Sequence, residues 1–164
     1  MLFNLRMLAI LTAFVGSVML GGAFAFQHLG GLDPCVLCID QRWAWAVVIA
    51  ASVMAIAFAR HTISCQALLA VAAIAMLAGA GFAGFHVGVE QHWWEGTSEC
   101  GGVTGKAQTV EELKRQLFAT PVTRCDEVAW SMAGVSMAGW NLILSLVGGI
   151  LLGWRVLSLP RSMP

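Results

Sequence analysis

Long apolar stretches alternate with shorter polar ones along this chain. Four stretches dominate, at residues 7–26, 43–59, 67–89 and 130–156. Each approaches or exceeds the roughly 20 residues with which an α-helix crosses about 30 Å of hydrocarbon. A helix satisfies its own backbone hydrogen bonds in lipid, whereas a lone strand leaves them unpaired. The pattern therefore predicts an all-α integral membrane protein built as a four-helix bundle.

Two polar segments, 27–42 and 90–129, connect the predicted spans on one side of the membrane. The second is long, and within 109–118 its apolar residues fall at positions 110, 113, 117 and 118. This spacing predicts a short amphipathic helix. Such a helix either lies flat on the membrane or packs against the bundle.

The first apolar stretch also has features of a cleavable signal peptide. Arg6 precedes it, and Ala23-Phe24-Ala25 resembles a cleavage site. However, its apolar part is longer than that of a usual signal peptide, and its removal leaves an odd number of crossings. We expect this stretch to be retained as the first span.

Composition supports a membrane protein. Of the 164 residues, 59% are hydrophobic and only 11% are charged. A soluble protein of this size cannot bury so much apolar surface, whereas a bilayer accommodates it. The formal net charge is zero, so electrostatics gives no reason to expect nucleic acid as a partner.

Charged residues fall on two sides of the predicted bundle. Every acidic residue lies within 27–42 or 90–127. The opposite side carries only basic residues, namely Arg6, Arg60, Arg155 and Arg161. Short loops rich in Lys and Arg stay in the cytoplasm, while long loops cross largely regardless of charge. We therefore expect cytoplasmic termini and two outward-facing loops.

Four of the five cysteines lie in the two outward loops. Cys35 and Cys38 form a Cys-x-x-Cys motif in the first loop, and Cys100 and Cys125 lie in the second. An exported, oxidising face is where disulfides persist. Cys65 lies near the cytoplasmic end of the third span, where we interpret it as a small packing residue.

Zinc binding and a static disulfide are the alternatives to redox chemistry. A zinc ribbon needs a second Cys-x-x-Cys motif about 15 to 20 residues after the first, and this chain has only one such motif. A structural disulfide explains Cys100 and Cys125, but it does not explain two cysteines beside a membrane helix. His86 and Glu90 have metal-ligand spacing without an apparent third ligand, so we interpret them as a polar interfacial pair.

Local sequence favours a reactive Cys38. Asp33 followed by Pro34 predicts an N-cap and a first helical residue just before Cys35. Both sulfurs then lie at the positive end of a helix dipole, which favours thiolate. Arg42 lies four residues after Cys38, on the same helical face. It either stabilises an anion at this site or anchors the helix by reaching the lipid headgroups.

At these residues the chain resembles the DsbB family of bacterial disulfide bond formation proteins. The matching residues are Phe26-Gln27-His28, Leu32, Pro34-Cys35-Val36-Leu37-Cys38-Ile39 and Arg42. Three later segments are also similar: Gly88-Val89-Glu90, the segment from Cys125-Asp126-Glu127 to Trp130, and Gly134–Asn141. The resemblance covers essentially the whole chain.

The resemblance implies a quinone-linked disulfide oxidoreductase of the bacterial inner membrane, with both loops in the periplasm. Cys100 is then expected to form a mixed disulfide with a reduced DsbA-type thiol oxidase, and Cys125 is its partner. Electrons pass to Cys35–Cys38 through a transient bond between Cys125 and Cys35. Cys38 then faces a quinone, either ubiquinone or menaquinone, with Arg42 near a quinone oxygen.

Two other functions remain open at this point. One is a quinone reductase of the vitamin K epoxide reductase type, although there the Cys-x-x-Cys motif typically follows the accessory pair rather than preceding it. The other is a non-enzymatic membrane protein whose cysteines are structural or bind metal.

Overall fold

The structure is a computed structural model that describes residues 2–98, 100, 109–111, 114 and 123–159. Four long helices form the body of this part of the chain. They are α1 (Leu2–His28), α2 (Val36–Ala57), α3 (Thr62–Glu90) and α5 (Met137–Leu157). All four are long and apolar enough to cross a membrane. The predicted four-helix membrane bundle is therefore confirmed. The predicted loop helix at 109–118 lies largely outside the described residues.

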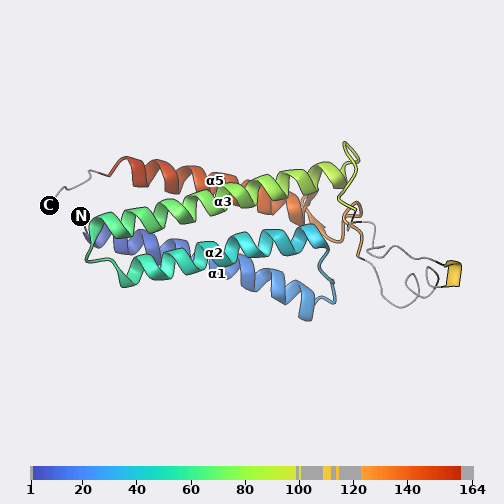
Figure 1. The fold of residues 1–164 in the computed structure, drawn as a ribbon, viewed down its shortest axis with the longest axis horizontal. Coiled ribbons are helices and arrows are strands. Elements are labelled where there is room, and N and C mark those ends of the chain that lie inside the picture. The colour runs from blue at the N-terminus through green and yellow to red at the C-terminus, as the bar shows by residue number, and fades with distance from the viewer. Residues whose placement is uncertain (1, 99, 101–108, 112–113, 115–122, 160–164) are drawn as a thin grey trace.

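The third helix is the centre of the bundle. α3 packs against α2 on one side and α5 on the other, while α1 packs mainly on α2 (Figure 1). α1 begins and α5 ends at the same end of the bundle, as an even number of crossings requires. The segments that carry Cys35–Cys38 and Cys100–Cys125 therefore lie at the opposite end.

Two helices begin at residues that differ from the sequence expectation. α2 begins at Val36, between the helix start expected at Pro34 and the start of the apolar stretch at residue 43, so the Cys-x-x-Cys motif belongs to the start of this helix. α5 begins at Met137 rather than near 130, because a short antiparallel ribbon precedes it. This ribbon pairs β1 (Ser131–Met132) with β2 (Val135–Ser136), and its turn uses positive φ at Ala133 and Gly134. The Ser136 hydroxyl then caps α5 by accepting the Gly139 N–H at 3.0 Å.

The outside of the bundle is largely apolar, and small residues are frequent inside it. Many of the large apolar side chains face outward, among them Leu11, Phe14, Ile74, Ile150 and Trp154. The bundle interior contains many small residues, including Ala9, Ala51, Ala55, Ala72 and Ala73. Small residues let membrane helices approach closely where lipid provides no hydrophobic force between them. Cys65 is fully buried in this interior beside other core residues such as Leu69, away from the outer cysteines.

Gly79 and Gly81 on α3 provide a matched test of this packing. A Cβ added at Gly79 lies 3.0 Å from Ala44 Cβ of α2, whereas one added at Gly81 has no atom within 4 Å. Gly79→Val should therefore lower the free energy of unfolding by about 1–3 kcal/mol, because overpacking forces the helices apart. Gly81→Val should change it by less than about 0.5 kcal/mol. Denaturation in detergent measures both, and equal effects would contradict the close approach of α2 and α3.

Candidate redox site

The Cys35 thiol caps the start of α2. Its backbone is extended, with φ −74° and ψ 171°, and its Sγ accepts the Cys38 backbone N–H at 3.2 Å. The expectation that Asp33 is the N-cap and Pro34 the first helical residue is therefore wrong. The helix begins later because the sulfur, rather than a carboxylate, receives the N–H group. Both sulfurs still lie at the positive end of the helix.

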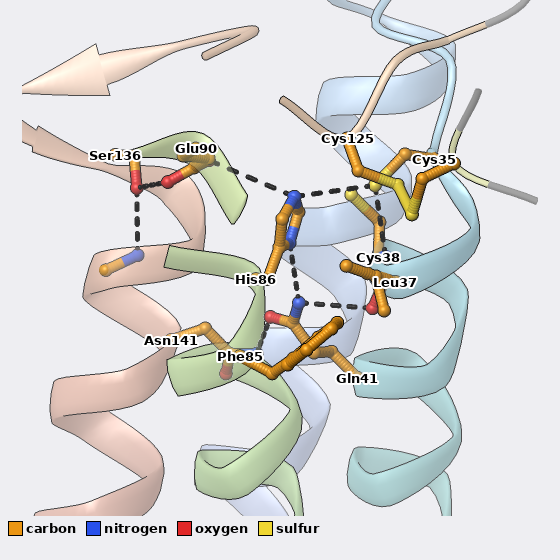
Figure 2. Close-up of polar contacts among 12 residues, drawn as sticks. Cys35, Leu37, Cys38, Gln41, Phe85, His86, Glu90, Cys125, Ser136 and Asn141 are labelled. Carbon is orange, nitrogen blue, oxygen red and sulfur yellow. Dashed lines mark hydrogen bonds and ion pairs between the residues drawn. A yellow bond between two sulfur atoms is a disulfide. The ribbon is translucent and has the colours of Figure 1, made fainter. Parts of the chain in front are cut away.

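The Cys35–Cys38 pair and the Cys100–Cys125 pair meet at this end of the bundle. Cys100 and Cys125 form a disulfide with a Cα–Cα distance of 5.2 Å, while Cys35 and Cys38 are free thiols. The disulfide packs on Cys35 in a buried cluster that also contains Val89, with Cys38 at its edge (Figure 2). Two cysteine pairs from segments far apart in the sequence thus lie within one small volume.

Cys35 holds its proton more firmly than an ordinary thiol. Its side-chain hydrogen bond with Cys38 and its burial both raise the pKa of the Cys35 thiol. Two neighbouring sulfurs compete for one negative charge, so the protonated form of one accompanies the anionic form of the other. The inner pair (Cys35 and Cys38) is therefore suited to carry one proton and one negative charge between its two sulfurs.

A chain of buried polar side chains leads away from Cys35 into the bundle. His86 of α3 places its Nε2 atom 3.7 Å from Cys35 Sγ and 4.0 Å from Glu90 Oε1. Its Nδ1 lies 2.9 Å from the Gln41 amide nitrogen, and Gln41 in turn meets Asn141 of α5 (Figure 2). Sequence reasoning assigned no role to Gln41 or Asn141. Asn141 carried a signal as a polar residue inside the apolar stretch 130–156, where such residues are rare, whereas Gln41 lay in the polar segment 27–42 and carried none.

The structure also changes the interpretation of His86. The sequence offered only Glu90 as its neighbour, but the ligand atoms of Cys35, Cys38 and His86 all lie within 4.8 Å of one another. This grouping has the ligand types of a zinc site. Whether His86 can ligate a metal depends on which ring nitrogen carries the proton.

Arg42 ties α2 to α1. Its guanidinium donates hydrogen bonds to the Gln27 side-chain oxygen and to the Ala23 carbonyl, at 2.5 and 3.2 Å. It also lies 5.1 Å from the centre of the Phe24 ring. These contacts hold the arginine against the bundle rather than extending it toward headgroups, in contrast to the snorkelling alternative.

Cys38 and Arg42 face a common cavity of about 350 Å³ at the cysteine end of the bundle. Its walls come from all four helices and from residues just before β1, and they include Val18, Met19, Gly22, Phe26, Trp130 and Leu144. Phe26 and Trp130 contact each other, with ring centres 4.9 Å apart. The cavity is mostly apolar with a few polar groups at one side, which is the usual composition of a small-molecule site.

Charged residues flank the outer disulfide. Arg124, next to Cys125, donates two hydrogen bonds to the Asp126 carboxylate and lies 3.4 Å from a Glu127 oxygen. The hydrogen bond from Arg124 lowers the pKa of the Asp126 carboxyl to about 2, with the positive charge adding to the effect. The same pairing raises the pKa of Arg124.

The fold and the site together define a multi-pass membrane thiol–disulfide oxidoreductase. The family model Disulfide bond formation protein DsbB matches residues 5–155 of the chain. The chain therefore belongs to the DsbB family, and its role is in disulfide bond formation at the bacterial inner membrane.

Several relatives agree with this assignment. Disulfide bond formation protein B of Methylococcus capsulatus is 33% identical over 84% of this chain and 87% of its own. Disulfide bond formation protein B of Stutzerimonas stutzeri is 30% identical over 88% of this chain and 91% of its own. No solved structure matches the chain significantly. Family membership favours a disulfide oxidoreductase over the vitamin K epoxide reductase type and over a non-enzymatic protein.

The titration of Asp126 tests the charge pairing beside Cys125. Its carboxyl should titrate near pH 2, and Arg124→Gln should move the midpoint toward the ordinary 3.8. Because the folded pKa is depressed, the pair stabilises the fold above the ordinary value and loses this contribution as pH falls toward 2. Carboxyl ¹³C NMR of protein labelled at aspartate measures the titration midpoint. The chain has three aspartates, and the signal that disappears in Asp126→Asn belongs to Asp126. An unchanged midpoint in Arg124→Gln would refute the pairing.

Proposed function

We propose that this protein reoxidises a periplasmic DsbA-type thiol oxidase and passes the electrons to membrane quinone, thereby sustaining disulfide formation in exported proteins. The contact between the Cys100–Cys125 disulfide and Cys35 carries the proposal, because it joins an outer pair to an inner pair that borders a cavity. The proposed orientation has both termini in the cytoplasm and both cysteine-bearing loops in the periplasm. The basic residues at the far end of the bundle, Arg6, Arg60 and Arg155, support it.

The first exchange takes place at Cys100. A thiolate of the reduced thiol oxidase attacks Cys100 Sγ, forming a mixed disulfide and releasing Cys125 as a thiolate. A hollow of about 670 Å³ borders Cys100 on the outer face and suits the approach of a protein partner. Trp93 and Trp94 line it together with Arg124, which gives it the aromatic and arginine content of many protein interfaces.

Two further exchanges move the electrons inward. The Cys125 thiolate attacks Cys35 of a Cys35–Cys38 disulfide, and Cys38 leaves as a thiolate. The second thiol of the oxidase then displaces Cys100, which leaves as a thiolate and attacks Cys125. This step restores the Cys100–Cys125 disulfide and releases Cys35. Two electrons, one negative charge and the one proton of the second thiol have then left the oxidase, and the inner pair is reduced, with the free and paired cysteines arranged as in the structure.

The cavity beside Cys38 suits a quinone. It combines apolar walls with a thiol and a guanidinium on one side, which matches a flat apolar ring with carbonyl acceptors. Arg42 carries five N–H donors, of which two bind α1, so further donors remain for a carbonyl oxygen. A bound ubiquinone or menaquinone supplies a two-electron, two-proton acceptor. Cys35 and Cys38 rejoin as a disulfide when they give up two electrons and their one proton, and solvent supplies the second proton.

A strong terminal acceptor is needed on energetic grounds. A DsbA-type oxidase has a potential of about −120 mV, so its reduced form is unusually stable. Each 30 mV by which a protein disulfide falls short costs about 1.4 kcal/mol for a two-electron couple. An acceptor in the membrane can drive the sequence of exchanges forward, and the inner pair lies at the end of membrane-spanning helices where such an acceptor is accessible.

Cys38→Ser tests the direction of electron flow. This variant should lose quinone reduction completely, because no thiolate then faces the cavity, while Cys100 should still form a mixed disulfide with the reduced oxidase. Quinol absorbance and non-reducing gels measure the two steps. Cys65→Ser, in the bundle interior, is the control and should retain both. Full quinone turnover by Cys38→Ser would refute the assignment.

Arg42→Met tests the quinone site. The variant should raise KM for a soluble quinone analogue about tenfold or more, the effect of losing one hydrogen bond from a charged donor. Single-turnover reduction of Cys35–Cys38 by the oxidase should remain unchanged, since that exchange takes place between cysteines and does not use the Arg42 guanidinium. Arg60→Met, at the other end of the bundle, is the matched control. A KM equal to that of the unmodified protein would remove Arg42 from the quinone site.

A further inference from the structure

We infer that His86 is a neutral hydrogen-bond donor to the Cys35 sulfur, held in this tautomer by Gln41 and Asn141. Its N–H group stabilises the negative charge that forms on Cys35 when this sulfur leaves its bond with Cys125. The role in catalysis rests on the proposed function, whereas the tautomer follows from the hydrogen-bond chain alone.

The orientation of Asn141 is set from the interior of the bundle. The Trp45 indole N–H donates to the Asn141 side-chain oxygen at 2.8 Å, and the Ser145 hydroxyl donates to the same atom at 3.1 Å. An indole nitrogen is only a donor, so the atom that it meets must be the amide oxygen. The Asn141 NH₂ group therefore points at Gln41, whose side-chain oxygen accepts its hydrogen bond at 2.5 Å.

The orientation of Gln41 is set from two sides. With its oxygen facing Asn141, its NH₂ group faces the Leu37 carbonyl at 3.1 Å and His86 Nδ1 at 2.9 Å. A carbonyl oxygen is only an acceptor, so Leu37 requires the same orientation independently of Asn141. The Trp45 indole, which only donates, and the Leu37 carbonyl, which only accepts, thus require the same orientation of the Gln41 amide. Gln41 donates to Nδ1, and Nδ1 must accept.

This leaves the histidine proton on Nε2. A neutral imidazole has one N–H group, and a second proton on Nδ1 would face the N–H of Gln41. Nε2 lies 3.7 Å from Cys35 Sγ, and the Cys38 backbone N–H approaches the same sulfur at 3.2 Å. Two N–H groups therefore point at Cys35 from α3 and from α2. His86 is only 5% exposed, so water competes little for this contact.

The neighbouring Cys38 and burial raise the pKa of the resting Cys35 thiol, and the two N–H groups act on the negative charge that forms on this sulfur during exchange. In the last exchange the Cys100 thiolate attacks Cys125, the Cys100–Cys125 bond forms and the Cys125–Cys35 bond breaks. The electron pair of the broken bond stays on Cys35 Sγ. One thiolate enters and one leaves, so the step needs no proton transfer and His86 keeps its proton throughout. Donors already aimed at the site of developing charge lower the barrier without reorganisation.

The same tautomer argues against a metal at Cys35, Cys38 and His86. A metal requires the lone pair of Nε2, which moves the proton to Nδ1. Gln41 must then invert, and its oxygen faces the Leu37 carbonyl while its NH₂ group faces that of Asn141. Buried groups of the same polarity in contact are costly. The amide chain therefore favours a donor to sulfur over a metal ligand.

Nitrogen NMR of ¹⁵N-histidine-labelled full-length protein tests the tautomer directly. The chain has four histidines, and His86→Gln identifies the signals of His86. We expect a protonated Nε2 and an unprotonated Nδ1 in the reduced inner pair. Gln41→Leu, which removes the donor to Nδ1, should introduce the other tautomer. An Nδ1-protonated or doubly protonated His86 in the unmodified protein would overturn the inference.

Kinetics test the role of the donor. After mixing with a reduced DsbA-type oxidase without quinone, acid quench and thiol alkylation follow the appearance of free Cys35. His86→Phe should slow this step about tenfold, the effect of one hydrogen bond to a charged group, and Gln41→Leu should slow it although His86 is retained. His61→Phe, at the far end of α3, is the control. Unchanged rates in both site variants would overturn the role.

The outcomes separate this inference from the proposed function. If the unmodified protein fails to reduce quinone, the proposed function fails, yet the NMR result still decides the tautomer. If it reduces quinone but His86→Phe reacts at the same rate, only the inference fails. Cd²⁺ binding to the reduced protein completes the test. Equal affinity in the unmodified protein and His86→Phe supports a non-ligating His86, and a clear loss of affinity in the variant would overturn it.

Discussion

The buried hydrogen-bond chain from Trp45 to His86 is the constraint on which the site depends. It joins α2, α5 and α3 in an interior where small apolar residues predominate. A polar group buried there without a partner costs several kcal/mol, so each amide has to meet its donor or acceptor. The rotation of each helix about its axis is fixed by that requirement, because a small turn breaks a contact. Small-residue packing brings the helices close, and the amides set their register.

The outer end of the bundle is fixed by a second set of contacts. The Ser136 hydroxyl donates to Glu90 at the end of α3 while it accepts the Gly139 N–H at the start of α5. Glu90 is also the acidic neighbour of His86. The ribbon before α5 therefore positions the segment after Cys125 over α3. The disulfide packs on Cys35 below this segment.

The sequence predicted the parts of the fold that depend on composition and spacing. Four apolar stretches gave the four helices, and the Cys-x-x-Cys motif with Arg42 gave one side of the site. The N-cap was assigned to Asp33 because carboxylates commonly cap helices, and the sequence alone does not show that a thiol accepts the N–H instead. The contact of His86 with Cys35 depends on how α3 rotates against α2, which no local pattern encodes. Asn141 was visible only as a polar residue in an apolar stretch, and Gln41 lay in a polar segment where nothing distinguished it.

The two sulfurs of one motif face different surroundings, and this difference suits a relay. Cys35 is almost fully buried beneath the outer disulfide and next to His86 Nε2, whereas Cys38 is half-buried; both line the cavity that Arg42 also lines. Cys35 can then exchange with the Cys100–Cys125 pair, while Cys38 faces the apolar cavity. Since each exchange replaces one thiolate with another, the protein needs fixed N–H donors rather than a proton carrier at Cys35. A neutral histidine meets this need, because it stabilises the leaving Cys35 thiolate while keeping its own proton.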